Sequence, residues 1–202
     1  MKILNVEQGS DEWLEARRGK ITGTKLKDII VLRGNVRKIG FYEILADKLA
    51  IEDDEHPIDR GSRLEEEAIE HFVGVSGKKV ETNVGLCVSD IDDSIAVSPD
   101  GLIKNKGKYT EAVEVKCLGS KYHLQAVIEN QIPKDYHFQV LQYFVVNDDL
   151  EKLYFVFYDP RIPSKPFHVI EAERDDEEVE KYKQYQIDVI NQINSYVEQL
   201  TF

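Results

Sequence analysis

Hydrophobic residues recur at helical spacing in the first third of the chain. Ser10 can cap a helix that runs through Gly19, and Thr22 or Thr24 can cap a second helix. Two further helical patterns follow, at residues 41–50 and 58–73. The N-terminal third is therefore predicted to be mostly helical.

The middle of the chain changes to the two-residue alternation of β-strands. Strands are predicted at residues 79–89, 94–103 and 111–117, with turns at 90–93 and 104–107. The last third shows helical patterns at 122–129 and 135–146, strands at 153–158 and 167–172, and a long amphipathic helix at 175–200. No repeat, low-complexity tract or linker divides the chain. This order predicts a single α/β domain over residues 1–202, with a central mixed β-sheet flanked by helices.

The composition is that of an ordinary globular protein, with 42% hydrophobic and 32% charged residues in a chain of 202. No apolar run approaches the roughly 20 residues that span a membrane. The start becomes acidic too early for a secretory signal. Cys87 and Cys117 suit a reducing compartment, and two cysteines are too few for a four-cysteine zinc or iron–sulfur site. We therefore expect a cytoplasmic protein.

Charge is distributed unevenly along the chain. The net charge of −12 argues against a general nucleic-acid coating protein. Residues 13–40 nevertheless carry eight bases and two acids, whereas residues 171–202 carry three bases and nine acids. The basic segment is either a local phosphate-binding surface or an ordinary solvated face.

Pro99 and Asp100, followed after a hairpin-length gap by Glu114-Val115-Lys116, form the chemically informative pattern. Alternate side chains on a strand share a face, so Glu114 and Lys116 point the same way while Val115 points into the core. A hairpin can bring Asp100 beside them. Two converging carboxylates suit Mg²⁺ or Mn²⁺. A lysine beside that cation can orient or deprotonate water and offset charge on a phosphorane-like transition state.

Each part of this pattern also has a structural reading. Asp-Gly is a common turn, and Glu-x-Lys is common in exposed strands as an ion-pair ladder. The combination in this order, within an apolar strand, is much more specific than its parts. We therefore interpret Asp100, Glu114 and Lys116 as a catalytic group.

Other acids and polar residues extend this group. Glu65, on the helix predicted upstream of the sheet, can be an additional metal ligand or hold a metal-bound water; the alternative is a solvated helix face shared with its neighbours. Gln139 and Tyr143 lie one turn apart on a later helix, with Tyr136 beside Gln139. Tyr143 is expected in the core.

Arg17 and Thr24 belong to the basic N-terminal segment, and Ser98 lies two residues before Asp100. Arginines and helix N-termini both bind phosphate. The alternative for Arg17 is a surface ion pair with Asp11, Glu15 or another surface acid, which contributes little.

Across almost its whole length the sequence resembles the phage lambda exonuclease family of viral alkaline exonucleases and recombinases, a branch of the PD-(D/E)XK nucleases. The resemblance rests on Trp13…Arg17-x-Gly19-x-Ile21-Thr22, Gly61-x-x-x-Glu65-x-x-Ala68, Ser98-Pro-Asp-Gly101, Glu114-x-Lys-Cys117, Tyr136-x-x-Gln139-Val140, Tyr158-Asp-Pro-Arg161 and Glu173-Arg-Asp175.

The resemblance implies a restriction-endonuclease-like core and a Mg²⁺-dependent deoxyribonuclease, with Mn²⁺ as a possible substitute. Such enzymes digest one strand of linear double-stranded DNA from the 5′ end. They leave 3′ overhangs that a single-strand annealing protein uses in homologous recombination. The resemblance also implies double-stranded DNA ends as substrate, a ring-shaped homotrimer and the cytoplasm of a bacterial host cell.

Matching positions imply roles for individual residues. Asp100 and Glu114 would hold Mg²⁺ together with the backbone carbonyl of Val115, with Glu65 completing the acidic side. Lys116 would act on the water. The remaining implied roles are support of the water and the scissile phosphate by Tyr136 and Gln139, and binding of the terminal 5′ phosphate by Arg17, Thr24 and Ser98.

The chain also departs from the family pattern. Its second glutamine, Gln142, stands three rather than two residues after Gln139, and Leu118 replaces a proline. One alternative function is a structure-specific or restriction-type endonuclease on the same fold, which would cut DNA with blocked ends. Another is a catalytically silent DNA-binding subunit, which would have no need of the complete catalytic group.

Overall fold

The computed structural model describes residues 1–31, 38, 41, 44, 62–118, 120–160, 162 and 164–201. Within these residues a five-stranded sheet has the order β2-β5-β6-β7-β8. β6 and β7 are parallel and the other neighbours antiparallel, so the sheet is mixed. The strands are β2 (Val80–Glu81), β5 (Gly101–Asn105), β6 (Lys108–Lys116), β7 (Lys152–Tyr158) and β8 (Phe167–Glu173).

A smaller sheet of order β1-β3-β4 adjoins the N-terminal helices. Its strands are β1 (Lys2–Leu4), β3 (Leu86–Val88) and β4 (Ala96–Val97). The described helices are α1 (Asp11–Arg17), α2 (Gly23–Ile29), α4 (Ser62–Ser76), α5 (Ser120–Glu129), α6 (His137–Val146) and α7 (Asp176–Leu200), with a 3₁₀ turn at Lys134–Tyr136. None of these helices has both the length and the apolar character needed to cross a bilayer.

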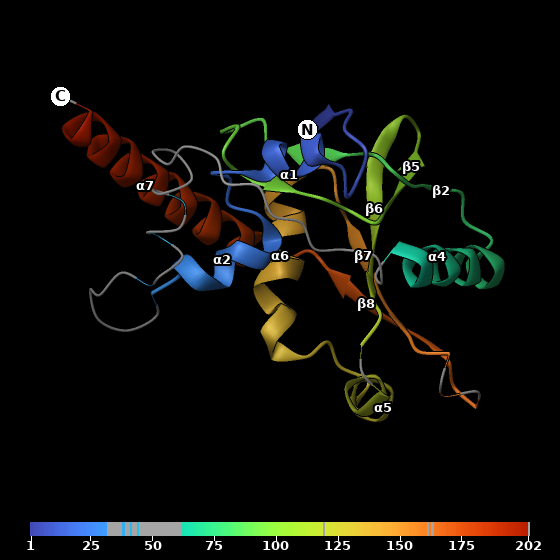
Figure 1. The fold of residues 1–202 in the computed structure, drawn as a ribbon. Helices are drawn as coiled ribbons and strands as arrows, with labels where there is room; N and C mark the ends of the chain where they lie inside the picture. Colours follow the sequence, from blue (N-terminus) through green and yellow to red (C-terminus); the bar gives the residue numbers. More distant parts are fainter. Residues whose placement is uncertain are drawn as a thin grey trace.

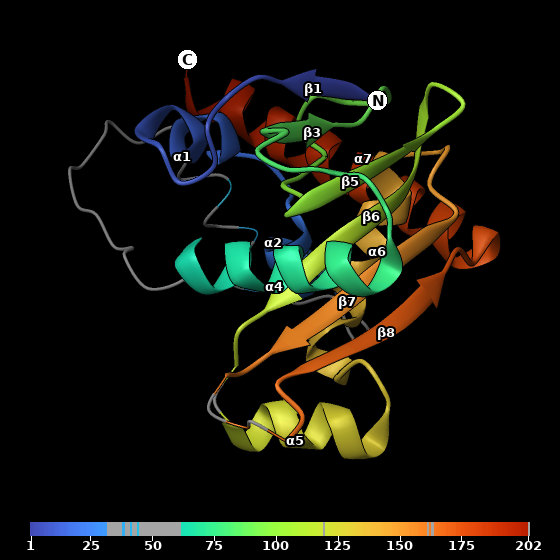
Figure 2. The same ribbon diagram turned by 90° about the vertical axis from the view of Figure 1, so that its right-hand side faces the viewer.

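Helices cover both faces of the large sheet. α4 lies on one face, and α6, with α2 and α7 beyond it, lies on the other (Figures 1 and 2). Side-chain alternation on β6 explains the two layers. Val113 and Val115 join the hydrophobic cluster of Phe72 on α4, whereas Ala112 joins the cluster of Phe144 on α6. The predicted α/β fold, with a central mixed sheet flanked by helices, is confirmed.

The helix ends follow local chemistry. The Ser10 hydroxyl accepts a hydrogen bond from the backbone N–H of Trp13 at 3.2 Å, so it caps α1 as predicted. α1 ends at Arg17 rather than at Gly19, where a positive φ of 66° turns the chain. Thr22 occupies the cap position of α2 without a side-chain capping bond. Residues 58–61, and most of the helix predicted at 41–50, lie outside the described residues.

Two predicted strands are each divided between the two sheets. Residues 79–89 form β2 and β3, because Asn83 and Gly85 adopt positive φ angles of 54° and 79° between them. A Cβ on Gly85 would lie 2.0 Å from the carbonyl oxygen of Leu4, so the chain passes close to its own N-terminal segment there. Residues 94–103 form β4 and β5, separated at Pro99, which has no N–H for a ladder bond. The predictions of single strands were wrong.

The predicted hairpin joins β5 to β6. Lys106 and Gly107 form its two-residue turn with φ angles of 49° and 87°, the conformation that suits a type I′ turn. At the other end Gly101 opens β5 opposite Val113. A Cβ on Gly101 would lie 2.4 Å from Cγ1 of Val80 on β2, so glycine after Asp100 allows the neighbouring strand to pack.

Candidate active site

The hairpin brings Asp100 beside the strand that carries Glu114. Asp100 directly precedes β5, and its Oδ2 accepts a hydrogen bond from the backbone N–H of Val115 at 2.7 Å. The predicted juxtaposition of the two carboxylates is therefore confirmed. This hydrogen bond across the hairpin fixes the position of the Asp100 carboxylate next to β6.

Three donors hold the carboxylate of Glu114, which is only 4% exposed. Lys116 Nζ donates to Oε1 at 2.6 Å, and Gln139 Nε2 donates to the same oxygen. The hydroxyl of Tyr143 donates to Oε2. Glu114 and Lys116 share a face of β6, as predicted, and the one-turn spacing of Gln139 and Tyr143 on α6 brings both to the same carboxylate.

Lys116 lies between this carboxylate and two aromatic rings. Its Nζ is 5.0 Å from the ring centroid of Tyr136 and 5.8 Å from that of Phe155. Burial lowers the pKa of Lys116, but the charge of Glu114 and the hydrogen bond to it outweigh this effect, and the pKa is raised overall. Lys116 is therefore a cation in this arrangement, with Tyr136 against it.

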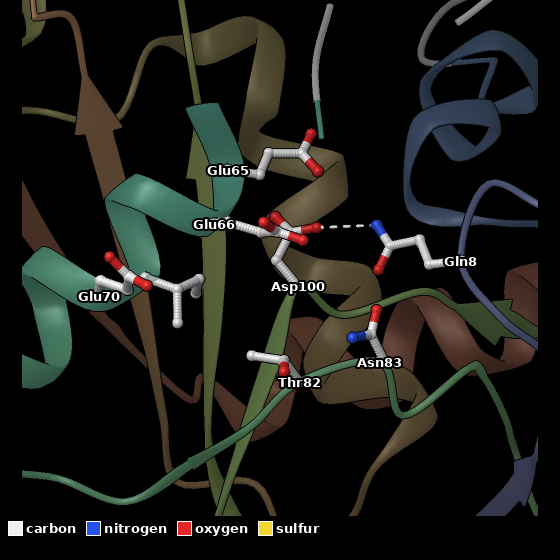
Figure 3. Close-up of a pocket in the computed structure, with 8 residues that line it drawn as sticks. Gln8, Glu65, Glu66, Glu70, Thr82, Asn83 and Asp100 are labelled. Atoms are coloured by element: carbon white, nitrogen blue, oxygen red, sulfur yellow. Dashed lines mark hydrogen bonds between the residues drawn. The ribbon is translucent and has the colours of Figure 1, made fainter. Parts of the chain in front are cut away.

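Asp100 is bound from the N-terminal segment as well. Gln8 Nε2 donates to Asp100 Oδ1 at 3.1 Å (Figure 3). Burial raises the pKa of Asp100 well above its usual value, and the charges of Glu114 and Glu65 raise it further. The bonds from Gln8 and from the Val115 backbone oppose this rise without cancelling it.

Glu65 faces the same region from the first turn of α4. It lines a pocket of about 260 Å³ with Asp100, and the close-up shows both side chains with Gln8 around this space (Figure 3). Burial raises the pKa of Glu65, and the charge of Glu114 adds to the effect. The two acids that follow Glu65 have different surroundings. Glu66 also lines the pocket, whereas Glu67 accepts a hydrogen bond from the Tyr158 hydroxyl at 3.1 Å.

The donor set suits a hard divalent cation. Asp100 and Glu114 offer carboxylate oxygens, and burial together with the charges of Glu114 and Glu65 raises the pKa of Asp100, so that a divalent cation would favour its ionised form. Among the described residues, no three His, Cys, Asp or Glu side chains are grouped closely enough to enclose a metal ion. Any metal here would thus depend on the two hairpin carboxylates, on backbone or water oxygens, and on Glu65 from the side.

Arg17 and Ser98 lie together. Arg17 Nη1 donates to Ser98 Oγ at 3.0 Å, and the guanidinium carbon lies 4.2 Å from the ring centroid of Trp13. Burial lowers the pKa of Arg17, against the opposing charges of Glu114 and Asp100. Glu15, one of the acids considered as a partner for Arg17, instead lies 3.6 Å from Nη1 of the neighbouring Arg18.

Thr24 does not form a direct contact with the Arg17–Ser98 pair in the described part of the chain. Its hydroxyl lies 3.3 Å from that of Thr22, and no hydrogen bond in the described part of the chain joins it to Arg17 or Ser98. Arg17 and Ser98 are thus in direct contact and Thr24 contacts neither of them, while phosphate binding by these three residues stays a prediction.

α6 is fixed in the core beside the site. Gln142 is buried and donates to the backbone oxygen of Ile21 at 2.8 Å and to Gln186 at 3.1 Å. A Cβ on Gly23 would lie 3.0 Å from Cγ of Gln139, so α2 packs directly against that residue. The glutamine that departs from the family spacing thus connects α6 to the N-terminal segment and α7 rather than to the carboxylates.

Two contacts of the site were not predicted. Gln8 belongs to a loop without periodicity, so only the fold reveals that it reaches Asp100. Tyr143 was expected in the core, and it is there, but its hydroxyl also bonds Glu114. Its spacing of four residues from Gln139 was the available signal.

Comparison with known proteins places the chain in a family. Residues 12–149 match the model of the YqaJ-like viral recombinase domain. The chain belongs to this family. No curated protein sequence matches it in a direct comparison.

Solved structures share the fold. An alkaline exonuclease, LHK-Exo from Laribacter hongkongensis, is 23% identical with a TM-score of 0.83 over 95% of this chain and 96% of that one. The structure of LHK-Exo in complex with dAMP is 24% identical with a TM-score of 0.81, again over 95% of this chain and 96% of that one. A phage-related exonuclease from Haemophilus somnus 129PT is 14% identical with a TM-score of 0.63, over 90% and 96%. Membership of this viral recombinase family agrees with the resemblance to the lambda exonuclease family, and the solved exonuclease structures show that the chain shares their fold.

Proposed function

We propose that the protein is a Mg²⁺-dependent exonuclease that digests one strand of linear double-stranded DNA from its 5′ end and leaves 3′ overhangs for homologous recombination. The observation that carries this proposal is the hairpin: Asp100 bonds the backbone of Val115, and Lys116 lies 2.6 Å from the buried Glu114. This arrangement combines two acids and a cation where a phosphate can be hydrolysed.

Different residues of the site would bind the metal, stabilise charge on the phosphate and position these groups. Asp100, Glu114 and the Val115 carbonyl, with Glu65 beside them, would hold Mg²⁺ or, in its place, Mn²⁺. When bound, the cation supplies positive charge to the phosphate oxygens and lowers the pKa of bound water. Lys116 is held by Glu114 and offsets the charge that develops on the phosphate. Tyr136 and Gln139 contact Lys116 and Glu114 and limit their motion.

The preference for ends is assigned to Arg17 and Ser98. A guanidinium binds a terminal phosphate in bidentate fashion, and a hydroxyl can take another oxygen. The charges of Glu114 and Asp100 act on Arg17, so this pair lies within electrostatic reach of the hairpin carboxylates. Thr24 would join it only after a change of side-chain position. A homotrimer, a single-strand annealing partner and the bacterial cytoplasm belong to the same proposal.

One experiment tests the direction and the end requirement together. A linear duplex is labelled separately at each 5′ and 3′ end, and a second duplex carries blocked ends. We expect Mg²⁺-dependent loss of 5′ label before 3′ label, no digestion of the blocked duplex, and no activity in excess chelator. Cleavage of the blocked duplex would instead indicate an endonuclease, and inactivity with every divalent cation would indicate a silent DNA-binding subunit.

A further inference from the structure

The hydroxyl of Tyr143 has a specific partner in the site. Tyr143 is only 2% exposed and lies on α6 within the larger hydrophobic cluster. Its hydroxyl donates to Oε2 of Glu114, whereas Lys116 and Gln139 both bond Oε1. Tyr143 is therefore the described donor that holds the second oxygen of this carboxylate.

The two oxygens of a carboxylate can exchange places by rotation about the bond to Cγ, unless both are bonded. Donors on Oε1 alone would leave Oε2 of Glu114 without a described partner in a buried strand. An unpaired buried oxygen is costly, and its carboxylate would turn to find another donor. The Tyr143 hydroxyl, which approaches from α6, prevents this rotation of the Glu114 carboxylate by bonding Oε2.

The ring and the hydroxyl of Tyr143 have separate roles in packing and in hydrogen bonding. The ring fills core volume that phenylalanine would fill equally well. The hydroxyl adds the hydrogen bond to Oε2 of Glu114, which phenylalanine cannot make.

We propose that Tyr143 is a positioning residue whose hydroxyl fixes the orientation of the Glu114 carboxylate and thereby sets the affinity of the site for its divalent cation. This inference rests on the proposed function, since it concerns the same cation. Removal of a residue that orients a metal ligand typically costs about 10- to 100-fold in metal affinity or activity.

Tyr143→Phe removes the hydroxyl and keeps the ring. Tyr109→Phe is the matched control, because the Tyr109 hydroxyl also donates to a glutamate, Glu81, at 2.7 Å, and Tyr109 lies on the same strand as Glu114 near the hairpin turn. Both variants and the wild type are compared at 10 °C, near the temperature of maximum stability, with folding checked by circular dichroism. Binding of Mn²⁺ is measured by calorimetry without DNA, and the rate of duplex digestion is measured against Mg²⁺ concentration.

We expect Tyr143→Phe to bind Mn²⁺ about 10- to 100-fold more weakly and to need correspondingly more Mg²⁺, while Tyr109→Phe stays within about twofold of wild type. Equal Mn²⁺ affinity and an unchanged Mg²⁺ requirement in folded Tyr143→Phe would overturn the role of Tyr143 alone. A wild type that binds no Mn²⁺ and digests no DNA would overturn the proposed function, and the inference with it.

Discussion

Asp100→Asn should make the metal-free protein more stable while abolishing digestion of DNA. The carboxylate of Asp100 is half-buried near Glu114 and Glu65, and its raised pKa shows that its charge is unfavourable there. Asparagine keeps the shape and both hydrogen bonds. Its Oδ1 can accept from the backbone of Val115, and its Nδ2 can donate to Gln8 once that amide turns over. The change therefore removes a charge without removing a bond.

Burial contributes most to the raised pKa of Asp100, and repulsion by Glu114 and Glu65 adds to it. Two like charges about 5 Å apart repel by roughly 3 kcal/mol at an effective dielectric constant of 20. Lys116 and Arg17 are attracted to the same carboxylates and reduce this repulsion. We expect a net gain of about 1–2 kcal/mol in the free energy of unfolding, within the usual range for relief of a single unfavourable group. In a chain of this size that corresponds to a rise of about 2–8 °C in the melting temperature.

The assay is thermal unfolding of wild type and Asp100→Asn in chelator and again with Mg²⁺. In chelator the variant should melt higher. Addition of Mg²⁺ should raise the melting temperature of wild type and leave the variant nearly unchanged, because a ligand stabilises only a state that binds it. Glu81→Gln serves as the control, since Glu81 accepts a hydrogen bond from Tyr109 outside the site. If Asp100→Asn melts lower than wild type in chelator, the reasoning from electrostatic repulsion is refuted.

Three further outcomes are expected. Lys116→Ala should remain folded and lose on the order of a thousandfold in rate, measured by single-turnover digestion, because it removes the cation beside the phosphate; near-wild-type digestion would contradict its role. Wild type should digest 5′-phosphoryl duplexes faster than 5′-hydroxyl duplexes, and Arg17→Ala should lose most of that preference in a direct comparison of rates; equal preference in both proteins would place end recognition elsewhere. Burial raises the pKa of Cys87 and that of Cys117 from 9.0 to about 12, so each thiol ionises earlier in the unfolded chain than in the folded one. Stability should therefore be constant below about pH 8 and fall by about 2 kcal/mol by pH 10, and urea unfolding at pH 8 and 10 that gave equal stabilities would contradict this.

The catalytic hairpin could be predicted because its determinants are local. Two-residue alternation places Glu114 and Lys116 on one face, and the turn at Lys106 and Gly107 sets the register that returns the chain to Asp100. The helical repeat likewise places Gln139 and Tyr143 one turn apart. These relations need only the geometry of a strand, a turn and a helix.

The remainder depends on packing between distant segments. Asn83 and Gly85 divide a stretch that alternates like one strand, and the reason is the approach of the N-terminal segment, which alternation does not encode. The contact of Gln8 with Asp100 spans 92 residues and needs the same approach. β1, absent from the predicted elements, pairs with β3 through that segment. Long-range packing thus sets the outer part of the site.

The proposed function requires an acidic chain to act on DNA, and the placement of the carboxylates bears on this requirement. Glu114 is buried and held by Lys116, Gln139 and Tyr143. Asp100 is half-buried and held by Gln8 and the backbone N–H of Val115, so neither carboxylate is fully exposed to bulk solvent. The unfavourable charge that remains at Asp100 is then a property of the metal-free state, and binding of a divalent cation would remove it. The same charge therefore destabilises the protein without metal and favours the metal once it arrives. A substitution that relieves this charge should consequently gain stability only by giving up the affinity on which catalysis depends.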